Sequence, residues 1–278
     1  EVSATPTAPV TTTLGDGTNP ANATLAPGGA ATMLDAFTFV TSTGTDTITA
    51  ITVGLAAGTS AGLSLVEITS DDGLTIYGSA STPASDTVAI TLTTSITATT
   101  TSTPYKVRIT PKSHAAMPAP AGASYATTGT VTAWTGTNTT AGTDAGSATL
   151  TIDNLSPANV TGASASPGNA QVTVSWTNPV DSDFANLVVL RKATTTITGV
   201  PSEGTSPALD TAVGDGTIRY ISSTSPFTDT TGLTNGTLYF YRIFAKDTNG
   251  NYSATGVEVS ATPTAGVAAP IIRVRGGA

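Results

Sequence analysis

The sequence contains no cysteine and a single histidine, and it has few charged or aromatic residues. Without cysteine the chain can form no disulfide, no thiolate metal site and no covalent attachment to a c-type haem. Ten basic and 18 acidic residues give a net charge of −8, and the basic residues are scattered rather than clustered. Because nucleic-acid binding requires a concentrated basic surface, we expect no nucleic-acid partner.

Long apolar runs are also missing. No segment approaches the ~18 consecutive apolar residues of a membrane-spanning helix, so we expect no membrane span. Residues 1–20 have neither the charged nor the apolar region of a signal peptide. We therefore expect that a leader has been removed, or that the chain is a segment of a longer protein.

The chain is rich in threonine, serine, alanine and glycine, and 38% of its residues are hydrophobic. Disordered chains combine low hydrophobicity with high net charge, so this composition predicts a folded protein. The abundance of β-branched residues favours strands over helices. A length of 278 residues is sufficient for two domains, each with a core of its own.

Alternation of apolar and polar residues predicts strands throughout, and no segment has a helical period with caps. The clearest alternating runs are Val88–Leu92 and Tyr105–Ile109. We expect eight or nine short strands over residues 10–153, which favours an Ig-like β-sandwich over a barrel. The segment Ile152–Pro157 reads as the boundary with a second domain.

Residues 154–264 contain three motifs in the order expected of a second sandwich. They are the strand Gln171–Trp176, the apolar strand Leu187–Arg191 and the segment Leu233–Tyr239. Together they resemble a bacterial fibronectin type III domain. The resemblance implies a core tryptophan at position 176 and a tyrosine corner at position 239, whose hydroxyl bonds back to the preceding chain. The Thr-, Pro- and Gly-rich residues 194–216 form a longer connection than is usual in this family, and we expect a flexible surface loop there.

The sequence therefore predicts an all-β protein of two tandem β-sandwich domains, the first Ig-like and the second fibronectin type III-like. Glu1–Ala8 recurs without change as Glu258–Ala265. Since the second copy includes the last strand of the second domain, we expect residues 1–9 to resemble the end strand and linker of a preceding repeat. The two-domain unit also resembles repeat modules of large surface proteins of metal-reducing bacteria. That resemblance implies an extracellular or cell-surface location in a bacterium.

The C-terminal tail, residues 265–278, contains a short strand-like run with no partner nearby in the sequence. The run is Ile271, Ile272, Arg273, Val274 and Arg275. An extended tail can add to the exposed sheet edge of a neighbouring molecule, and repeated addition that does not close produces a filament. The alternatives are a disordered tail or the opening strand of a further repeat.

The sequence offers few candidate catalytic or metal-binding residues. His114 is the only possible histidine base, and its neighbour Ser113 lies in no nucleophile elbow, so we expect no enzyme activity. Asp247, Asn249 and Asn251 occupy positions 1, 3 and 5 of an EF-hand-like calcium loop, but the glycine required at position 6 is replaced by Tyr252. A hairpin turn is the favoured interpretation, with calcium binding as an alternative. We expect no other metal or cofactor.

These observations predict a structural module of an extracellular filament or stalk, assembled end to end through self-association or through neighbouring repeats. The alternative is an adhesin or carbohydrate-binding module, in which the loops around residues 111–124 and 194–216 contact a ligand.

Overall fold

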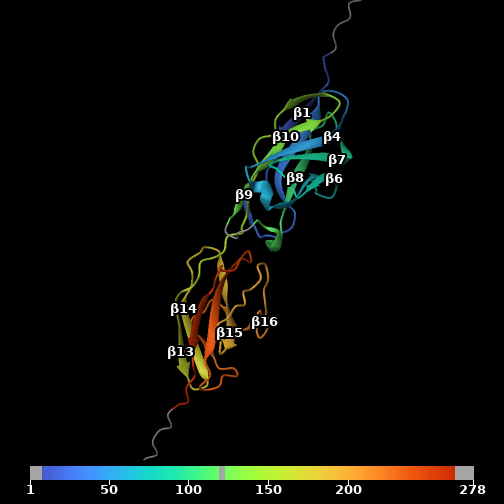
Figure 1. Cartoon of the computed structure of the whole chain (residues 1–278). Helices are drawn as coiled ribbons and strands as arrows, with labels where there is room; N and C mark the ends of the chain where they lie inside the picture. Colours follow the sequence, from blue (N-terminus) through green and yellow to red (C-terminus); the bar gives the residue numbers. More distant parts are fainter. Residues whose placement is uncertain (1–7, 119–122, 267–278) are drawn as a thin grey trace, which may run out of the picture. The chain divides into compact units, whose positions relative to one another are not determined.

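The computed structural model describes residues 8–118 and 123–266 (Figure 1). These residues form two compact units that divide between Leu155 and Ser156. Each unit is a β-sandwich, so the prediction of an all-β protein with two tandem sandwich domains is confirmed. The predicted assembly run Ile271–Arg275 lies outside the described residues. No helix in the described ranges is long and apolar enough to cross a membrane.

The first unit contains more strands than the eight or nine expected from the sequence. The additional ones are short runs that give no clear alternation. The described residues of this unit form twelve strands: β1 (Thr11–Asp16), β2 (Ala23–Leu25), β3 (Thr32–Thr41), β4 (Asp46–Leu55), β5 (Leu63–Ser70), β6 (Ile76–Ser81), β7 (Thr87–Ala98), β8 (Thr103–Pro111), β9 (Tyr125–Thr127), β10 (Gly129–Thr135), β11 (Thr139–Gly142) and β12 (Leu150–Ile152).

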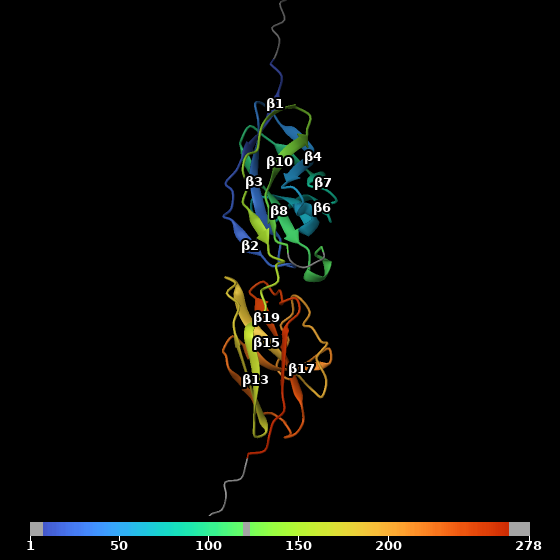
Figure 2. The same cartoon turned by 60° about the vertical axis from the view of Figure 1, so that its left-hand side comes forward.

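These strands form two main sheets, with one small sheet beside them (Figure 2). The larger sheet has the order β11-β1-β3-β8-β5-β6, and the second has the order β10-β4-β7. Strands β2, β12 and β9 form the small sheet. The pairs β1–β11 and β2–β12 are parallel, which the sequence alone did not indicate.

The first core lies between the two main sheets. The alternating residues of β7 and β8 that the sequence assigned to a core are buried there, including Val88, Ile90, Val107 and Ile109. Tyr105 stacks on Phe37 with ring centroids 5.7 Å apart. Burial of these apolar side chains supplies the main driving force for folding this unit.

In its described residues, 156–266, the second unit contains eight strands, and they form two sheets. The strands are β13 (Thr161–Gly168), β14 (Gln171–Thr177), β15 (Phe184–Ala193), β16 (Ala212–Val213), β17 (Gly216–Ser222), β18 (Phe227–Asp229), β19 (Tyr239–Asp247) and β20 (Val257–Ala261). One sheet has the order β13-β14-β18 and the other the order β16-β17-β15-β19-β20. The chain changes sheets from β14 to β15, from β17 to β18 and from β18 to β19. Such crossings are typical of the Greek-key connections of Ig-type sandwiches, where strands A, B and E oppose strands C, F and G.

The core of this sandwich contains the residues that the fibronectin-like motifs indicated. Trp176 is 6% exposed, and its indole N–H donates to Asn178 Oδ1 at 2.9 Å. Tyr239, Tyr241 and Ile243 point from β19 into the same core. The predicted tyrosine corner is also present, because the hydroxyl of Tyr239 accepts a hydrogen bond from the backbone N–H of Thr234.

The connection formed by residues 194–216 differs from the expected flexible loop. Its Ile197 is buried in a second apolar cluster, which lies on the outer face of the sheet and includes Leu190, Phe244 and Tyr252. The Ile197 N–H donates to Glu258 Oε2 at 2.7 Å. Hydrogen bonds and apolar contacts therefore fix this connection on a sheet face that would otherwise expose apolar side chains.

Candidate functional site

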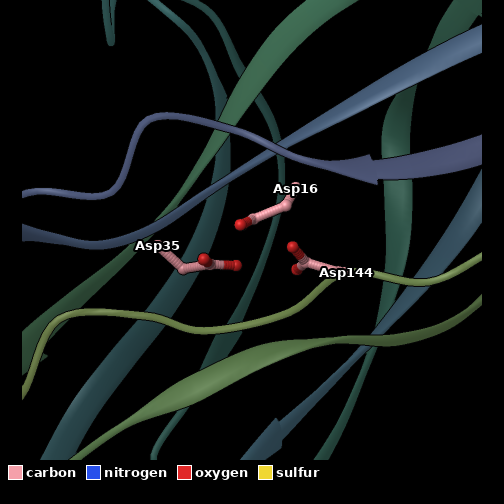
Figure 3. A group of neighbouring side chains, drawn as sticks. All are labelled: Asp16, Asp35 and Asp144. Atoms are coloured by element: carbon pink, nitrogen blue, oxygen red, sulfur yellow. The ribbon is translucent and has the colours of Figure 1, made fainter.

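The strongest concentration of unsatisfied polar atoms in the described residues is a group of three carboxylates in the first unit. Asp16 ends β1, Asp35 lies in β3, and Asp144 lies in the connection between β11 and β12. One oxygen from each residue lies within 4.8 Å of the others. Figure 3 shows the three carboxylates turned toward a common space.

Backbone contacts of β3 bring Asp16 and Asp35 together. After Asp16 the chain stays against β3, because Gly17 N–H donates to Ala36 O at 2.8 Å and Asn19 Oδ1 accepts from Ala36 N–H at 3.0 Å. The pairing of β3 with β8 shifts register next to Asp35, as in a β-bulge. These contacts position Asp16 beside Asp35.

The connection that carries Asp144 is held against the same strand. Ala148 N–H donates to Leu34 O at 2.9 Å, and Val131 N–H donates to Asp144 Oδ2 at 2.7 Å. Asp144 therefore approaches Asp35 from a segment distant in sequence, and one of its oxygens is oriented by β10.

The electrostatics of this group are unfavourable if all three residues are charged and nothing lies between them. Asp35 is completely buried, and neither of its carboxylate oxygens has a hydrogen-bond partner. Asp144 Oδ1 is also buried without one. Burial, together with the neighbouring carboxyl of Asp144, raises the pKa of Asp35 well above its ordinary value. Burial likewise raises the pKa of Asp144.

This arrangement suits the binding of a cation or a proton better than catalysis on a large substrate. Glycoside hydrolysis requires two carboxyl groups that face each other across a bound sugar. Asp35 has no exposed surface at which a sugar could bind. In the described part of the chain, none of the ion pairs includes Asp16, Asp35 or Asp144, so no basic side chain neutralises the group.

The three residues were not among those selected from the sequence. They are far apart in the chain and form no recognisable metal-binding motif. A partial signal exists in the run that surrounds Asp35, where an acidic residue interrupts a strongly apolar strand. Such a residue needs a partner, but the sequence does not show which distant segments supply it.

The calcium candidates chosen from the sequence lie in the turn after β19. Asp247 Oδ1 accepts hydrogen bonds from the backbone N–H groups of Asn249 at 2.9 Å and Asn251 at 2.8 Å. Asp247 Oδ2 accepts one from Asn251 Nδ2 at 2.7 Å. The carboxylate thus holds its own turn together, as the hairpin interpretation expects, and calcium binding at this turn stays a prediction.

His114 begins a short 3₁₀ turn that ends at Ala116, and Ser113 directly precedes it. Met117 follows the turn and packs into the first core. The loop at residues 111–124 is described only in part, because residues 119–122 lie outside the described ranges. Its role as a ligand-binding loop stays a prediction.

No family model and no curated protein matches the chain. Among solved structures, the spore cortex lytic enzyme SleM of Clostridium perfringens is 13% identical, with a TM-score of 0.29 over 58% of this chain. This chain spans only 33% of SleM. A titin structure is 10% identical, with a TM-score of 0.38 over 91% of this chain and 66% of that one.

A structure of fibronectin(III)-like modules of Clostridium thermocellum CbhA is 11% identical, with a TM-score of 0.29, and covers 91% of this chain and 94% of that one. All three scores lie below 0.5. The fold assignment of the second unit therefore rests on its own strand order and on its tyrosine corner.

Proposed function

We propose that this chain is a non-enzymatic structural module of an extracellular bacterial assembly, repeated or joined end to end in a surface filament or stalk. The observation that carries the proposal is the recurrence of Glu1–Ala8 as Glu258–Ala265. Eight identical residues at this separation indicate a repeating unit.

The structural role of the second copy supports this interpretation. Its residues include most of strand β20, which pairs with β19 at the edge of a sheet. The linker that follows is tied to the same sandwich, since Pro263 O accepts from Gly236 N–H at 2.8 Å and Thr264 N–H donates to Gly168 O at 3.0 Å. An identical segment at residues 1–8 has the sequence needed to end a preceding sandwich of the same kind.

The polar side chains of both units support a scaffold role, because many of them fasten loops to strands. In the second unit Asp215 accepts hydrogen bonds from the backbone of Thr198 and Gly199 and pairs with Lys192 at 2.6 Å. In the first unit Asp86 accepts from the backbone of Gly58 and Ser60. Loops held in this way suit a module that transmits force or maintains spacing.

For the joining of modules we propose strand addition by the tail, with Ile271, Ile272, Arg273, Val274 and Arg275 as the added segment. As a strand, this run would place Ile272 and Val274 on one face and the two arginines on the other. Main-chain hydrogen bonds would supply affinity, and the apolar face would pack on the acceptor module.

A peptide-binding experiment tests this step. A labelled peptide of residues 266–278 is titrated with a chain that ends at residue 265, and fluorescence anisotropy reports binding. We expect saturable binding that is lost when Ile272 and Val274 of the peptide are both changed to Asp. A peptide with Arg273→Ser is the matched control and should still bind. Absence of binding by the unchanged peptide would contradict tail-mediated assembly.

One observation favours the alternative of a carbohydrate-binding module. Trp134 is only half-buried and lines a shallow pocket of about 270 Å³ with Thr132 and Thr140. Aromatic rings at such positions can stack on sugars. Its ring also packs on Phe39, with centroids 5.5 Å apart, so the core accounts for part of its placement. Glycan binding that disappears in Trp134→Ala would support the alternative.

A further inference from the structure

We infer that Asp16, Asp35 and Asp144 bind one calcium ion within the first unit. The site is separate from the hairpin turn at Asp247 and does not depend on the proposed function. Its ligands come from the end of β1, from β3 and from the connection between β11 and β12 (Figure 3).

The carboxylate of Asp35 lacks the partners that a buried polar group needs. It is fully buried, both of its oxygens lack a hydrogen-bond partner, and they point toward the carboxylates of Asp16 and Asp144. A buried polar group without a partner is costly, and a buried charge without one is more costly still. A cation in the common space would satisfy these oxygens and the buried Oδ1 of Asp144 together.

The spacing of the three carboxylates fits a single calcium ion. One oxygen of each carboxylate lies within 4.8 Å of the other two. Calcium binds oxygen at about 2.3–2.6 Å, so oxygens on opposite sides of one ion are separated by about 4.6–5.2 Å. Three oxygens at the observed separations can therefore contact a single ion, and solvent at the exposed side of Asp16 leaves room for further ligands.

The chemistry of the ligands indicates which ion the site binds. The proposed ligands are all carboxylate oxygens, and hard oxygen donors favour calcium or magnesium over zinc or copper. Magnesium demands a near-ideal octahedron at shorter distances and loses its waters reluctantly. Calcium tolerates irregular coordination by separate chain segments, which is the arrangement here.

The competing occupant is a proton shared between Asp35 and Asp144. Burial raises the pKa of both groups in the absence of a metal, so a protonated pair would also relieve the repulsion. The two possibilities differ in one respect, because only the metal site responds to calcium at constant pH.

The test uses the full chain, freed of metal with EDTA and then dialysed. Thermal unfolding at pH 7.5 is followed with no added metal and with calcium chloride in the millimolar range, and isothermal titration calorimetry gives the stoichiometry. A ligand that binds only the folded state stabilises it. We therefore expect saturating calcium to raise the unfolding temperature of the first unit by ~5 °C. We expect one ion per chain.

Asp35→Asn and Asp144→Asn should abolish the calcium-dependent shift, and Asp16→Asn should reduce the affinity at least tenfold. Asp16 is exposed, so this third variant remains informative if the buried changes impair folding. Asp247→Asn and Asp86→Asn are the matched controls and should keep the full shift. Hydrogen exchange at Val131 N–H, which donates to Asp144, should slow on addition of calcium.

Three results would overturn the inference. The first is the absence of any calcium-dependent change in stability, heat or exchange, which would assign the cluster to a shared proton. The second is a shift that survives in both Asp16→Asn and Asp144→Asn. The third is a shift that is lost in Asp247→Asn but kept in Asp35→Asn, which would place the calcium site in the second unit.

Discussion

The hydroxyl of Tyr239 accepts a hydrogen bond from the backbone N–H of Thr234 at 3.1 Å. The contact closes the segment that leads into β19, while the ring is buried and the guanidinium of Arg191 lies 5.5 Å from its centroid. The side chain of Tyr239 thus holds the segment that precedes β19 and also packs in the core of the second unit.

Replacing this hydroxyl should weaken the second unit without changing its fold. Tyr239→Phe keeps the ring and removes only the acceptor, so we expect a loss of about 1 kcal/mol in the free energy of unfolding. Urea denaturation of the second unit measures the loss. Tyr220→Phe, which removes an exposed hydrogen bond to Thr224 O, is the control and should have a smaller effect. Equal effects would argue against a special role for the corner.

A buried ion pair should contribute more than this hydrogen bond. Asp229 is 1% exposed and binds Arg191 Nη1 at 2.8 Å and the Tyr241 hydroxyl at 3.1 Å. Burial and the nearby Asp229 carboxylate raise the pKa of Tyr241, so this hydroxyl stays protonated as a donor at neutral pH. Removing the carboxylate would leave the guanidinium without its buried partner.

For Asp229→Ala we expect a loss of about 3–5 kcal/mol in the stability of the second unit, as for other broken buried pairs. Asp210→Asn is the control, because the Asp210 side chain is 70% exposed where it pairs with Arg219, and a pair with a solvated carboxylate contributes about 0–1 kcal/mol. Chemical denaturation monitored by circular dichroism distinguishes the two. If Asp229→Ala and Asp210→Asn both caused small losses of stability, the ion pair at Asp229 would be better solvated than its burial indicates.

The packing of residues 194–216 can be tested at Ile197. This side chain is 3% exposed and lies against Leu190, Ile218 and Phe244, so Ile197→Ala should cost about 2–4 kcal/mol. Val200→Ala, in the same connection but at 48% exposure, should change stability by less than ~0.5 kcal/mol. Limited proteolysis should also cut the Ile197 variant faster within this connection. If both variants behaved alike, the connection would be loose in solution.

Acid should weaken the first unit partly through Asp46. Burial acts to raise the pKa of Asp46, but hydrogen bonds from Thr12, Thr137 and Asn138 outweigh it and hold the pKa below 3.8. Because the folded pKa is depressed, the stabilisation is complete above pH ~4 and is lost as the pH falls from that value through the folded pKa.

Asp46→Asn should therefore destabilise the first unit at pH 7 by about 1–3 kcal/mol, since its amide cannot accept all the bonds that the carboxylate accepts. The difference between the variant and the unchanged chain should shrink as the pH falls below ~4. Denaturation curves collected between pH 2.5 and pH 7 give this difference directly. A difference independent of pH would show that the carboxylate is not the group responsible.

Much of the second unit was predictable because its motifs are local. The alternation in Gln171–Trp176 placed Trp176 in the core, and the segment before Tyr239 indicated the corner. The sequence did not lead us to expect that residues 194–216 cover the outer face of the sheet that contains β15. The uninterrupted apolar run Leu187–Leu190 is nevertheless typical of a strand buried on both faces. The expectation of a flexible loop at residues 194–216 was based on composition alone. Composition does not show that one residue, Ile197, is buried and holds the connection against the sheet.

Several features of the first unit could not be predicted from local sequence patterns. Its long strands follow from alternation, but the three-residue strands and the parallel pairs β1–β11 and β2–β12 depend on contacts between distant segments. The same is true of the carboxylate group. Asp16 and Asp144 look like ordinary turn residues, and only Asp35, inside an apolar strand, gives a partial signal before the fold brings the three together.

Electron microscopy of the purified chain, with and without residues 266–278, tests the proposed assembly most directly. We expect regular filaments from the full chain and only dispersed molecules from the truncated one. Dispersed molecules in both samples, over the concentrations at which the tail peptide saturates its acceptor, would contradict assembly through the C-terminal strand.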